Sequence, residues 1–306
     1  MSGRVYAIAG GKGGVGKTTT VANLATALSA AGYDVVGVDV DLGMANLGPV
    51  LGVDPDEGAT IHDVLAGEDG ISAATYETDR DFSVIPGTQA LDEYSEADPS
   101  RLKYAVGPLT EEYDIVLLDT SAGLSHEVMV PLGLADSVVL ITTPDVVAIR
   151  DAAKSGELAA RVGGSVEGVT INRAHGNEET QELIDELGDE VLATIPEDSA
   201  ITMTHVVART GSPAAKAFSN LAARLIGVDQ LEETEREYAS LEPAIEEVEG
   251  DEPVEEAKEE EEATGSTAGP VTTAAYDETE SESFFTEERE EEERASALGR
   301  LRRIFE

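Results

Sequence analysis

The chain has 306 residues, with 63 acidic residues against 20 basic ones and a formal net charge of −43. An acidic excess that continues through the part with a core pattern predicts adaptation to molar salt, because there the Debye length falls to about 3 Å and self-repulsion is screened. No cysteine is present and no run approaches the roughly 18 apolar residues of a membrane span, so disulfides, cysteine-ligated metal or iron–sulfur clusters and transmembrane helices are excluded.

Short apolar runs alternate with alanine-rich stretches through about residue 226. The runs that we predict as strands cover residues 5–9, 35–40, 82–85, 115–118, 138–142, 169–172 and 191–195. They are nearly continuous in apolar residues, which is typical of strands covered on both faces. Helices are expected between most of them, for example at residues 18–31, which Gly32 ends, and at 151–161. This alternation predicts an α/β fold, a mostly parallel twisted sheet with helices on both faces.

The first predicted strand leads directly into a glycine-rich loop, GGKGGVGKTTT, at residues 10–20. Its glycines, Lys17 and Thr18 satisfy the phosphate-loop pattern G-x-x-x-x-G-K-[ST] in the expected context, after a strand and before a helix. Backbone N–H groups and the helix N-terminus would face the phosphates, with Lys17 on the β- and γ-phosphates and the Thr18 hydroxyl on Mg²⁺. The nucleotide contacts predicted in the loop are Gly11, Lys12, Gly13, Gly14, Val15, Gly16, Lys17, Thr18 and Thr19. Lys12 is a second lysine that the pattern does not require.

Acidic residues end two other predicted strands. Asp119 follows the apolar run DIVLL and precedes TSAG, as in a Walker B strand, and Asp39 and Asp41 end the run VVGVDVD. Ligands of parallel sheets bind at the carboxyl ends of the strands, and Mg²⁺ takes few carboxylates from the protein. The predicted metal-site residues are Thr18, Asp39 and Asp119. A helix cap or a turn is the alternative, which the neighbouring phosphate loop disfavours.

Five segments occur in a fixed order over about residues 3–226: GKGGVGKTT, DVDLGMAN, LLDTSAG, INR and IPEDSAI. Together they resemble the MinD/ParA ATPases, which carry a deviant Walker A motif. The resemblance is closest to the MinD branch, of the archaeal, haloarchaeal type. It implies a P-loop NTPase fold of the SIMIBI type, ATP and Mg²⁺ as cofactors, and a homodimer that closes on two ATP molecules.

The resemblance also implies roles for the matched residues. Lys12 would be the signature lysine that reaches the partner's phosphates, Asp41 would position the attacking water, and these two with Lys17 would form the catalytic set. Asp39 would support the switch region and Mg²⁺. The implied switch residues are Asn46 and Gly123.

The adenine site is implied by the same comparison of motifs. Asn172 would read the base, and the residues implied around it are Arg173, Pro196 and Asp198. The chain departs from many MinD sequences at Ser121, where they have proline, so the second switch is expected to be less constrained here.

The character of the sequence changes after Leu225, which ends the predicted ATPase domain near residue 228. Residues 229–285 are rich in glutamate and predict a disordered acidic linker. Residues 286–306 predict a short amphipathic helix, which resembles the membrane-targeting segment of MinD. Docking of this helix on the core or on a partner protein is the alternative. The residues assigned to the membrane are Leu298, Leu301, Ile304 and Phe305.

The function expected from these features is that of a cytoplasmic ATPase that dimerises on ATP, binds the membrane reversibly and positions other machinery with an unknown protein partner. A ParA-like partition ATPase and a nucleotide-gated scaffold that needs no hydrolysis are the alternatives. A nucleic-acid partner is disfavoured, because electrostatic affinity for DNA falls steeply with salt and this chain is acidic. The four histidines show no ligand spacing and are expected to be surface or core residues: His62, His126, His175 and His205.

Overall fold

The computed structural model describes residues 2–123, 125–201, 207–231 and 279–305. By its contacts the chain divides into one unit of residues 1–234 and 288–306 and a second unit of residues 235–287. Of the second unit the structure describes only 279–287, which are helical. Most of the predicted linker, 229–285, therefore lies outside the described residues, and its disorder stays a prediction.

The first unit is built on one sheet in the order β3-β4-β2-β5-β1-β6-β7-β8. Its strands are β1 (Arg4–Ala9), β2 (Val35–Val40), β3 (Tyr76–Glu77), β4 (Ser83–Ile85), β5 (Ile115–Thr120), β6 (Ser137–Thr142), β7 (Val166–Ala174) and β8 (Val191–Pro196). Every neighbouring pair is parallel except β3 and β4, which are antiparallel at one edge. The mostly parallel sheet is confirmed. Strand β3 was not predicted, because two residues are too short to show a period.

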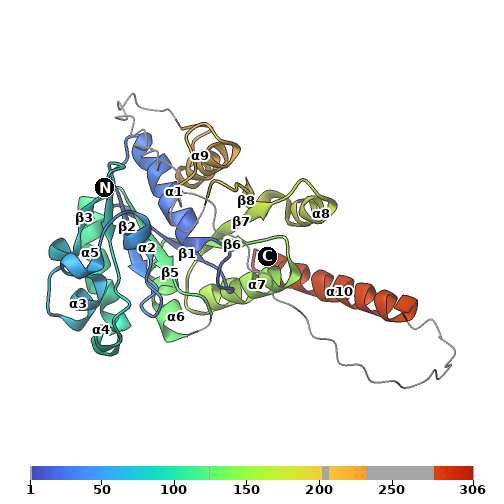
Figure 1. Cartoon of the computed structure of the whole chain (residues 1–306), viewed down its shortest axis with the longest axis horizontal. Coiled ribbons are helices and arrows are strands. Elements are labelled where there is room, and N and C mark those ends of the chain that lie inside the picture. Colours follow the sequence, from blue (N-terminus) through green and yellow to red (C-terminus); the bar gives the residue numbers. More distant parts are fainter. Residues whose placement is uncertain (1, 124, 202–206, 232–278, 306) are drawn as a thin grey trace, which may run out of the picture. The chain divides into compact units, whose positions relative to one another are not determined.

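Helices cover both faces of this sheet (Figure 1). The helices of the described residues are α1 (Lys17–Ala30), α2 (Leu47–Val50), α3 (Ile61–Ala66), α4 (Leu91–Glu96), α5 (Leu102–Glu112), α6 (His126–Leu134), α7 (Val146–Arg161), α8 (Glu178–Leu187), α9 (Pro213–Ile226) and α10 (Thr279–Arg302), of which α10 does not lie on the sheet. Strand β1 shows the division: Val5 and Ala7 pack with α3, α5, α6 and α7, whereas Tyr6 and Ile8 pack with α1 and α9. Alternation along strands that are buried on both faces thus produces two cores.

Two helices next to the phosphate loop begin at positions that the local sequence fixes. Helix α1 starts after Gly16, which has a φ of 99° that favours glycine. Helix α7 starts after Asp145, whose side chain accepts a hydrogen bond from the N–H of Ala148 and so caps the helix. Both helix N-termini lie at the carboxyl edge of the sheet, where β1 and β6 end.

The C-terminal helix differs from the prediction in its start. Helix α10 begins at Thr279 rather than at residue 286, so seven residues assigned to the linker are helical. Acidic residues in the first turns of a helix complement its dipole, and glutamate has a good helix propensity. Among the described residues, no helix is long and apolar enough to cross a membrane.

Candidate nucleotide-binding site

The loop between β1 and α1 approaches neighbouring elements closely at two glycines. A Cβ on Gly16 would lie 2.1 Å from Nδ2 of Asn172, and a Cβ on Gly11 would lie 2.2 Å from the carbonyl oxygen of Asp151. Any side chain at either position would push the loop away from β7 or from α7. The loop is therefore held in its curled form by glycine on both sides, as a phosphate-binding backbone requires.

Asn172 lies beneath this loop at the carboxyl end of β7 and is 6% exposed. Its Nδ2 donates to the carbonyl of Val15 at 2.8 Å, and its Oδ1 accepts from the N–H of Arg173 at 2.9 Å. Arg173 has a φ of 51°, which is uncommon for a residue with a side chain. Asn172 thus fastens the phosphate loop to the sheet, and its contact with adenine stays a prediction.

The two lysines of the loop lie in different environments. Lys17 is buried. Burial raises the pKa values of both Asp41 and Asp119, and the positive charge of Lys17 offsets part of this rise at each carboxylate. Lys12 lies on the rim, where its Nζ is 3.3 Å from Oδ1 of Asp145 and both side chains are nearly half exposed. Within one chain, Lys12 therefore points toward the start of α7 rather than into the loop.

Asp145 was not among the predicted site residues, although it follows β6 at the same edge of the sheet. Besides Lys12, it accepts hydrogen bonds from the Thr143 hydroxyl and the N–H of Ala148. Partial burial raises the pKa of Asp145, but these three donors outweigh burial and hold it below its ordinary value. The signal that was available is an aspartate directly before a helix, at a strand end beside the phosphate loop.

Asp39 organises the loop that follows β2. Its carboxylate accepts backbone N–H groups from Asp41 at 3.2 Å and from Asn46 and Leu47 at 2.8 Å each. Complete burial raises its pKa to about 7, against the lowering effect of these hydrogen bonds. Asn46, a predicted switch residue, is therefore tied to Asp39 through its backbone.

Asp119 has the features expected of a group that faces a cation. It is 1% exposed, and its Oδ1 has no hydrogen-bond partner among the described residues. Burial first, and then the Asp39 carboxylate opposite it across the β2–β5 pair, raise its pKa to about 8, while a hydrogen bond from Thr18 and the charge of Lys17 lower it. A divalent cation would reverse such shifts, because it stabilises the ionised form.

The donor set fits Mg²⁺. Thr18, Asp39 and Asp119 offer oxygen ligands or water-mediated contacts, which suit this ion. The described residues contain no group of three or more acidic or histidine side chains that could hold a metal alone.

Asp41 lies in the loop between β2 and α2 and is partly buried. Burial raises its pKa, the nearby Lys17 lowers it, and its Oδ1 accepts the N–H of Met44 at 3.2 Å. The carboxylate of Asp41 therefore has a raised affinity for protons, which the charge of Lys17 partly offsets.

His62 supports the same loop from below and was predicted only as a surface or core residue. Its ring is buried, with Nε2 2.9 Å from the carbonyl oxygen of Leu42 and Nδ1 accepting the N–H of Thr88 at 3.2 Å. A neutral ring with its proton on Nε2 satisfies both contacts. Sequence spacing gave no signal for this role, because the partners of His62 are backbone groups 20 and 26 residues away.

A cavity of about 610 Å³ lies between the end of β8 and the start of α9, a volume suited to a small ligand. Pro196 and Asp198, two of the predicted adenine residues, line it together with Arg209. Asn172 and Arg173 do not line this cavity. The structure therefore divides the predicted adenine set between the cavity and the underside of the loop.

The remaining predicted residues lie apart from this edge or at its margin. Gly123, in the second predicted switch, has a φ of 108° and precedes a residue outside the described ranges. Leu298 and Leu301 are buried against the core, and Ile304 and Phe305 are partly buried against the same cluster. The four residues assigned to the membrane are thus packed on protein in this structure.

Comparison with known proteins identifies the matching family. Residues 6–205 match the model of the CobQ/CobB/MinD/ParA nucleotide binding domain. An uncharacterised ATP-binding protein of Methanocaldococcus jannaschii is 34% identical over 236 residues, 73% of this chain and 88% of that protein. The septum site-determining protein MinD of Bacillus subtilis is 31% identical over 245 residues, 74% and 90% of the two chains. The structure of Pyrococcus horikoshii MinD complexed with Mg-ADP has a TM-score of 0.68 at 35% identity and covers 72% of this chain and 95% of that one.

Proposed function

Because this chain belongs to the CobQ/CobB/MinD/ParA family of nucleotide-binding domains, we propose that it is a MinD-like ATPase that dimerises on ATP and binds the membrane reversibly to position other machinery. The family expected from the five sequence segments is confirmed. The observation that carries the proposal is the geometry of the loop edge. There Lys17 is buried beside Asp41 and Asp119, while Lys12 lies on the rim.

The buried groups account for nucleotide binding and for water activation. The curled backbone and Lys17 would hold the phosphates, and Thr18 and Asp119 would hold Mg²⁺, which supplies positive charge to the transferring phosphoryl group. Asp41 would position the attacking water, because its raised pKa favours accepting a proton. Catalysis of phosphoryl transfer rests mainly on positioning and charge stabilisation, and these residues provide both.

Lys12 would complete the site of a second copy. A pair as exposed as Lys12 and Asp145 stabilises by at most about 1 kcal/mol, so Lys12 can readily exchange this partner for a phosphate. A cation supplied in trans raises the rate of phosphoryl transfer by about 10³ to 10⁵. Hydrolysis would then depend on dimerisation.

Substitution of Lys12 tests the enzymatic half of the proposal. Lys12→Ala is expected to abolish ATP hydrolysis and to leave ATP binding by Lys17 largely intact. Lys103→Ala, on an exposed lysine of α5, is the control and should change neither. Turnover at the unaltered rate in Lys12→Ala would show that Lys12 has no part in hydrolysis.

Vesicle co-sedimentation in molar KCl tests the membrane half. The full chain should sediment with vesicles in the presence of ATP, and less with ADP or without nucleotide. A chain that ends at residue 293 should stay in the supernatant, since it lacks the four predicted membrane residues. Binding that is absent, or that is independent of nucleotide, would contradict a nucleotide-controlled membrane switch.

DNA is the partner that the ParA-like alternative would require. A formal net charge of −43 opposes that partner, and molar salt removes most of the electrostatic affinity that basic patches provide. The Lys12→Ala variant also distinguishes the proposal from a scaffold role that needs no hydrolysis. If the protein is such a scaffold, the variant should retain function in the cell.

A further inference from the structure

The C-terminal part of α10 lies against α7 and α8 through its apolar face. Ala297, Leu298 and Leu301 are 2%, 4% and 0% exposed. They belong to the same buried cluster as Ala153 of α7 and Leu183 of α8. The face that the sequence assigns to lipid is thus covered by the chain's own core.

Polar contacts flank this apolar face on both sides. On α7, the guanidinium of Arg300 donates from Nε and Nη2 to the two carboxylate oxygens of Glu157, at 3.2 and 3.4 Å. On α8, Arg294 donates to the backbone carbonyl of Glu179 and lies 3.9 Å from the Glu182 carboxylate. Two arginines of one helix thus meet acidic or carbonyl oxygens of two different helices, so this position of α10 is specified by more than apolar packing.

The C-terminal end of the chain packs on α7 at a residue without a side chain. Gly156 is buried within α7, and a Cβ built on it would lie 2.4 Å from Cδ1 of Ile304. Ile304 therefore occupies the space that a side chain at position 156 would fill. We call the surface formed by Ala153, Gly156, Glu157 and Leu183 the α7–α8 groove.

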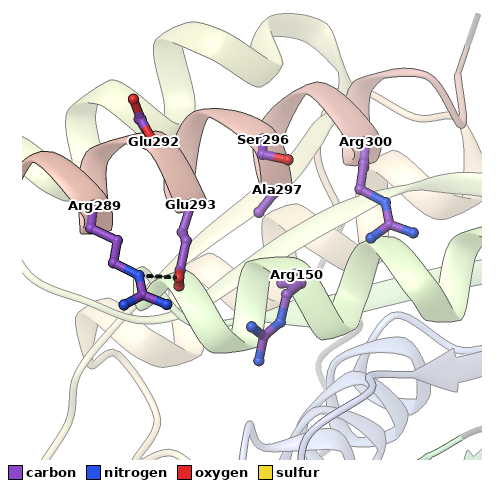
Figure 2. A pocket seen from close by; sticks show the side chains of 7 residues that line it. All are labelled: Arg150, Arg289, Glu292, Glu293, Ser296, Ala297 and Arg300. Carbon is purple, nitrogen blue, oxygen red and sulfur yellow. Dashed lines mark ion pairs between the residues drawn. The ribbon is translucent and has the colours of Figure 1, made fainter.

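The contact between α7 and α10 is open to solvent along part of its length. A cavity of about 340 Å³ lies between α7 and α10 and is lined by Arg150, Arg289, Glu292, Glu293, Ser296, Ala297 and Arg300 (Figure 2). The ion pair of Arg300 with Glu157 is more than a third exposed on both sides, so it contributes no more than about 1 kcal/mol, and the few apolar residues carry most of the docking free energy.

We propose that the α7–α8 groove is a binding site for the chain's own C-terminal helix, and that docking there competes with the lipid bilayer for the same apolar face. This inference rests on the proposed membrane association. One face cannot contact both surfaces, so the helix must leave the groove before it enters a bilayer. Because residues 227–278 tether it to the core, the released helix returns to the groove at a high effective concentration.

A disulfide between the groove and the helix tests the competition directly, because the chain has no cysteine of its own. The double variant Gly156→Cys with Ile304→Cys joins two positions that touch in the docked state. Oxidation should give a cross-linked monomer that no longer sediments with phosphatidylcholine vesicles in the presence of ATP. The same sample after reduction is the matched control, because both states carry the same two substitutions. It should sediment clearly more than the oxidised sample, although less than the unsubstituted chain, since Ile304→Cys removes part of the lipid-binding face.

Each other outcome contradicts a defined part of the inference. Equal sedimentation of oxidised and reduced protein would show that docking does not cover the lipid-binding face. Failure to cross-link would show that the helix is not in the groove, and a cross-linked dimer would show that it docks on a second copy. If the cross-linked monomer forms and neither its two states nor the unsubstituted chain binds vesicles, the docked helix stands and the proposed membrane association is wrong.

A charge exchange provides a second test that leaves the apolar face unaltered. Glu157→Arg removes the ion pair and places two positive charges together, so vesicle binding without ATP should rise roughly three- to tenfold. Adding Arg300→Glu restores an opposite-charge pair and should return binding to the wild-type level. Glu111→Arg, on the exposed surface of α5, is the control for the change in net charge. No rise in Glu157→Arg, or no rescue in the double variant, would contradict docking in the groove.

Discussion

Asp119→Asn is expected to stabilise the nucleotide-free protein at alkaline pH. In the folded protein, burial raises the pKa of Asp119 from its model-peptide value of 3.8 to about 8. Because the folded state then binds the proton more tightly than the unfolded state, the free energy of unfolding falls as pH rises between about 4 and about 8. One pKa unit corresponds to 1.36 kcal/mol, so from about pH 5 to about pH 8 the wild type should lose about 4 kcal/mol that the amide variant does not lose. This is an upper limit, because water that enters beside Asp39 would stabilise the ionised carboxylate.

The assay is denaturant unfolding in molar KCl with EDTA, at several pH values from about 5 to about 8.5. The quantity to compare is the difference in unfolding free energy between variant and wild type, since the carboxylates remote from Asp119 contribute equally to both. The facing Asp39 does not, because the variant removes the repulsion between the two carboxylates. Asp92→Asn, on an exposed carboxylate of α4, is the matched control and should show no pH-dependent difference. With Mg²⁺ and ATP the order should invert, because the wild type gains binding free energy through Asp119 and the variant does not.

A difference between Asp119→Asn and wild type that is independent of pH would refute this reasoning. It would mean that Asp119 is ionised in the ligand-free fold and that a cation or a rearranged loop already compensates its burial. Retention of full magnesium-dependent stabilisation by the variant would separately remove Asp119 from the metal site.

Three further outcomes test other parts of the structure. His62→Phe leaves two buried backbone groups without their hydrogen-bond partner, which costs about 1–3 kcal/mol for each group. It should lower kcat in a steady-state hydrolysis assay more than it lowers ATP affinity in a nucleotide titration. His175→Phe, at an exposed histidine, is the control and should change neither. Gly16→Ala, at a φ of 99° and with no room for a Cβ, should lower nucleotide affinity more than tenfold in a fluorescence titration, whereas Gly70→Ala, with open space around it, should not. Leu301→Ala should weaken docking of α10 by about 2–3 kcal/mol, seen as lost hydrogen-exchange protection in α10 with an unchanged global unfolding midpoint.

The sheet and the phosphate loop could be predicted because their signals are local. Strand β2 was placed at its observed bounds by an apolar run between turn residues, and the loop by glycines and Lys17 at fixed spacing. The contacts of His62, and the contact of Asp145 with Lys12, could not be predicted, because these partners are far along the chain and those of His62 are backbone groups that leave no sequence pattern.

The C-terminal helix shows a different limit. The apolar stripe predicted from the sequence is present. Such a stripe indicates only that this face of the helix will be removed from water, and it does not indicate which surface covers it. Lipid and the groove of α7 and α8 both satisfy it, so the choice depends on Glu157 and Gly156, which the helix sequence does not contain. The roles of Lys12 and Asp41 likewise depend on a second chain and on ATP, and they stay proposals.

The dual use of one apolar face has a consequence for how such a switch can evolve. A substitution that makes Ile304 or Leu301 more apolar increases the transfer free energy into lipid and into the groove by similar amounts, because both depend on the area removed from water. The two gains in free energy cancel in the difference between the docked state and the lipid-bound state. Helix hydrophobicity is therefore nearly neutral for the set-point of the switch. Selection can move that set-point only through residues that affect docking but not lipid binding, such as Gly156 and Glu157 of the groove.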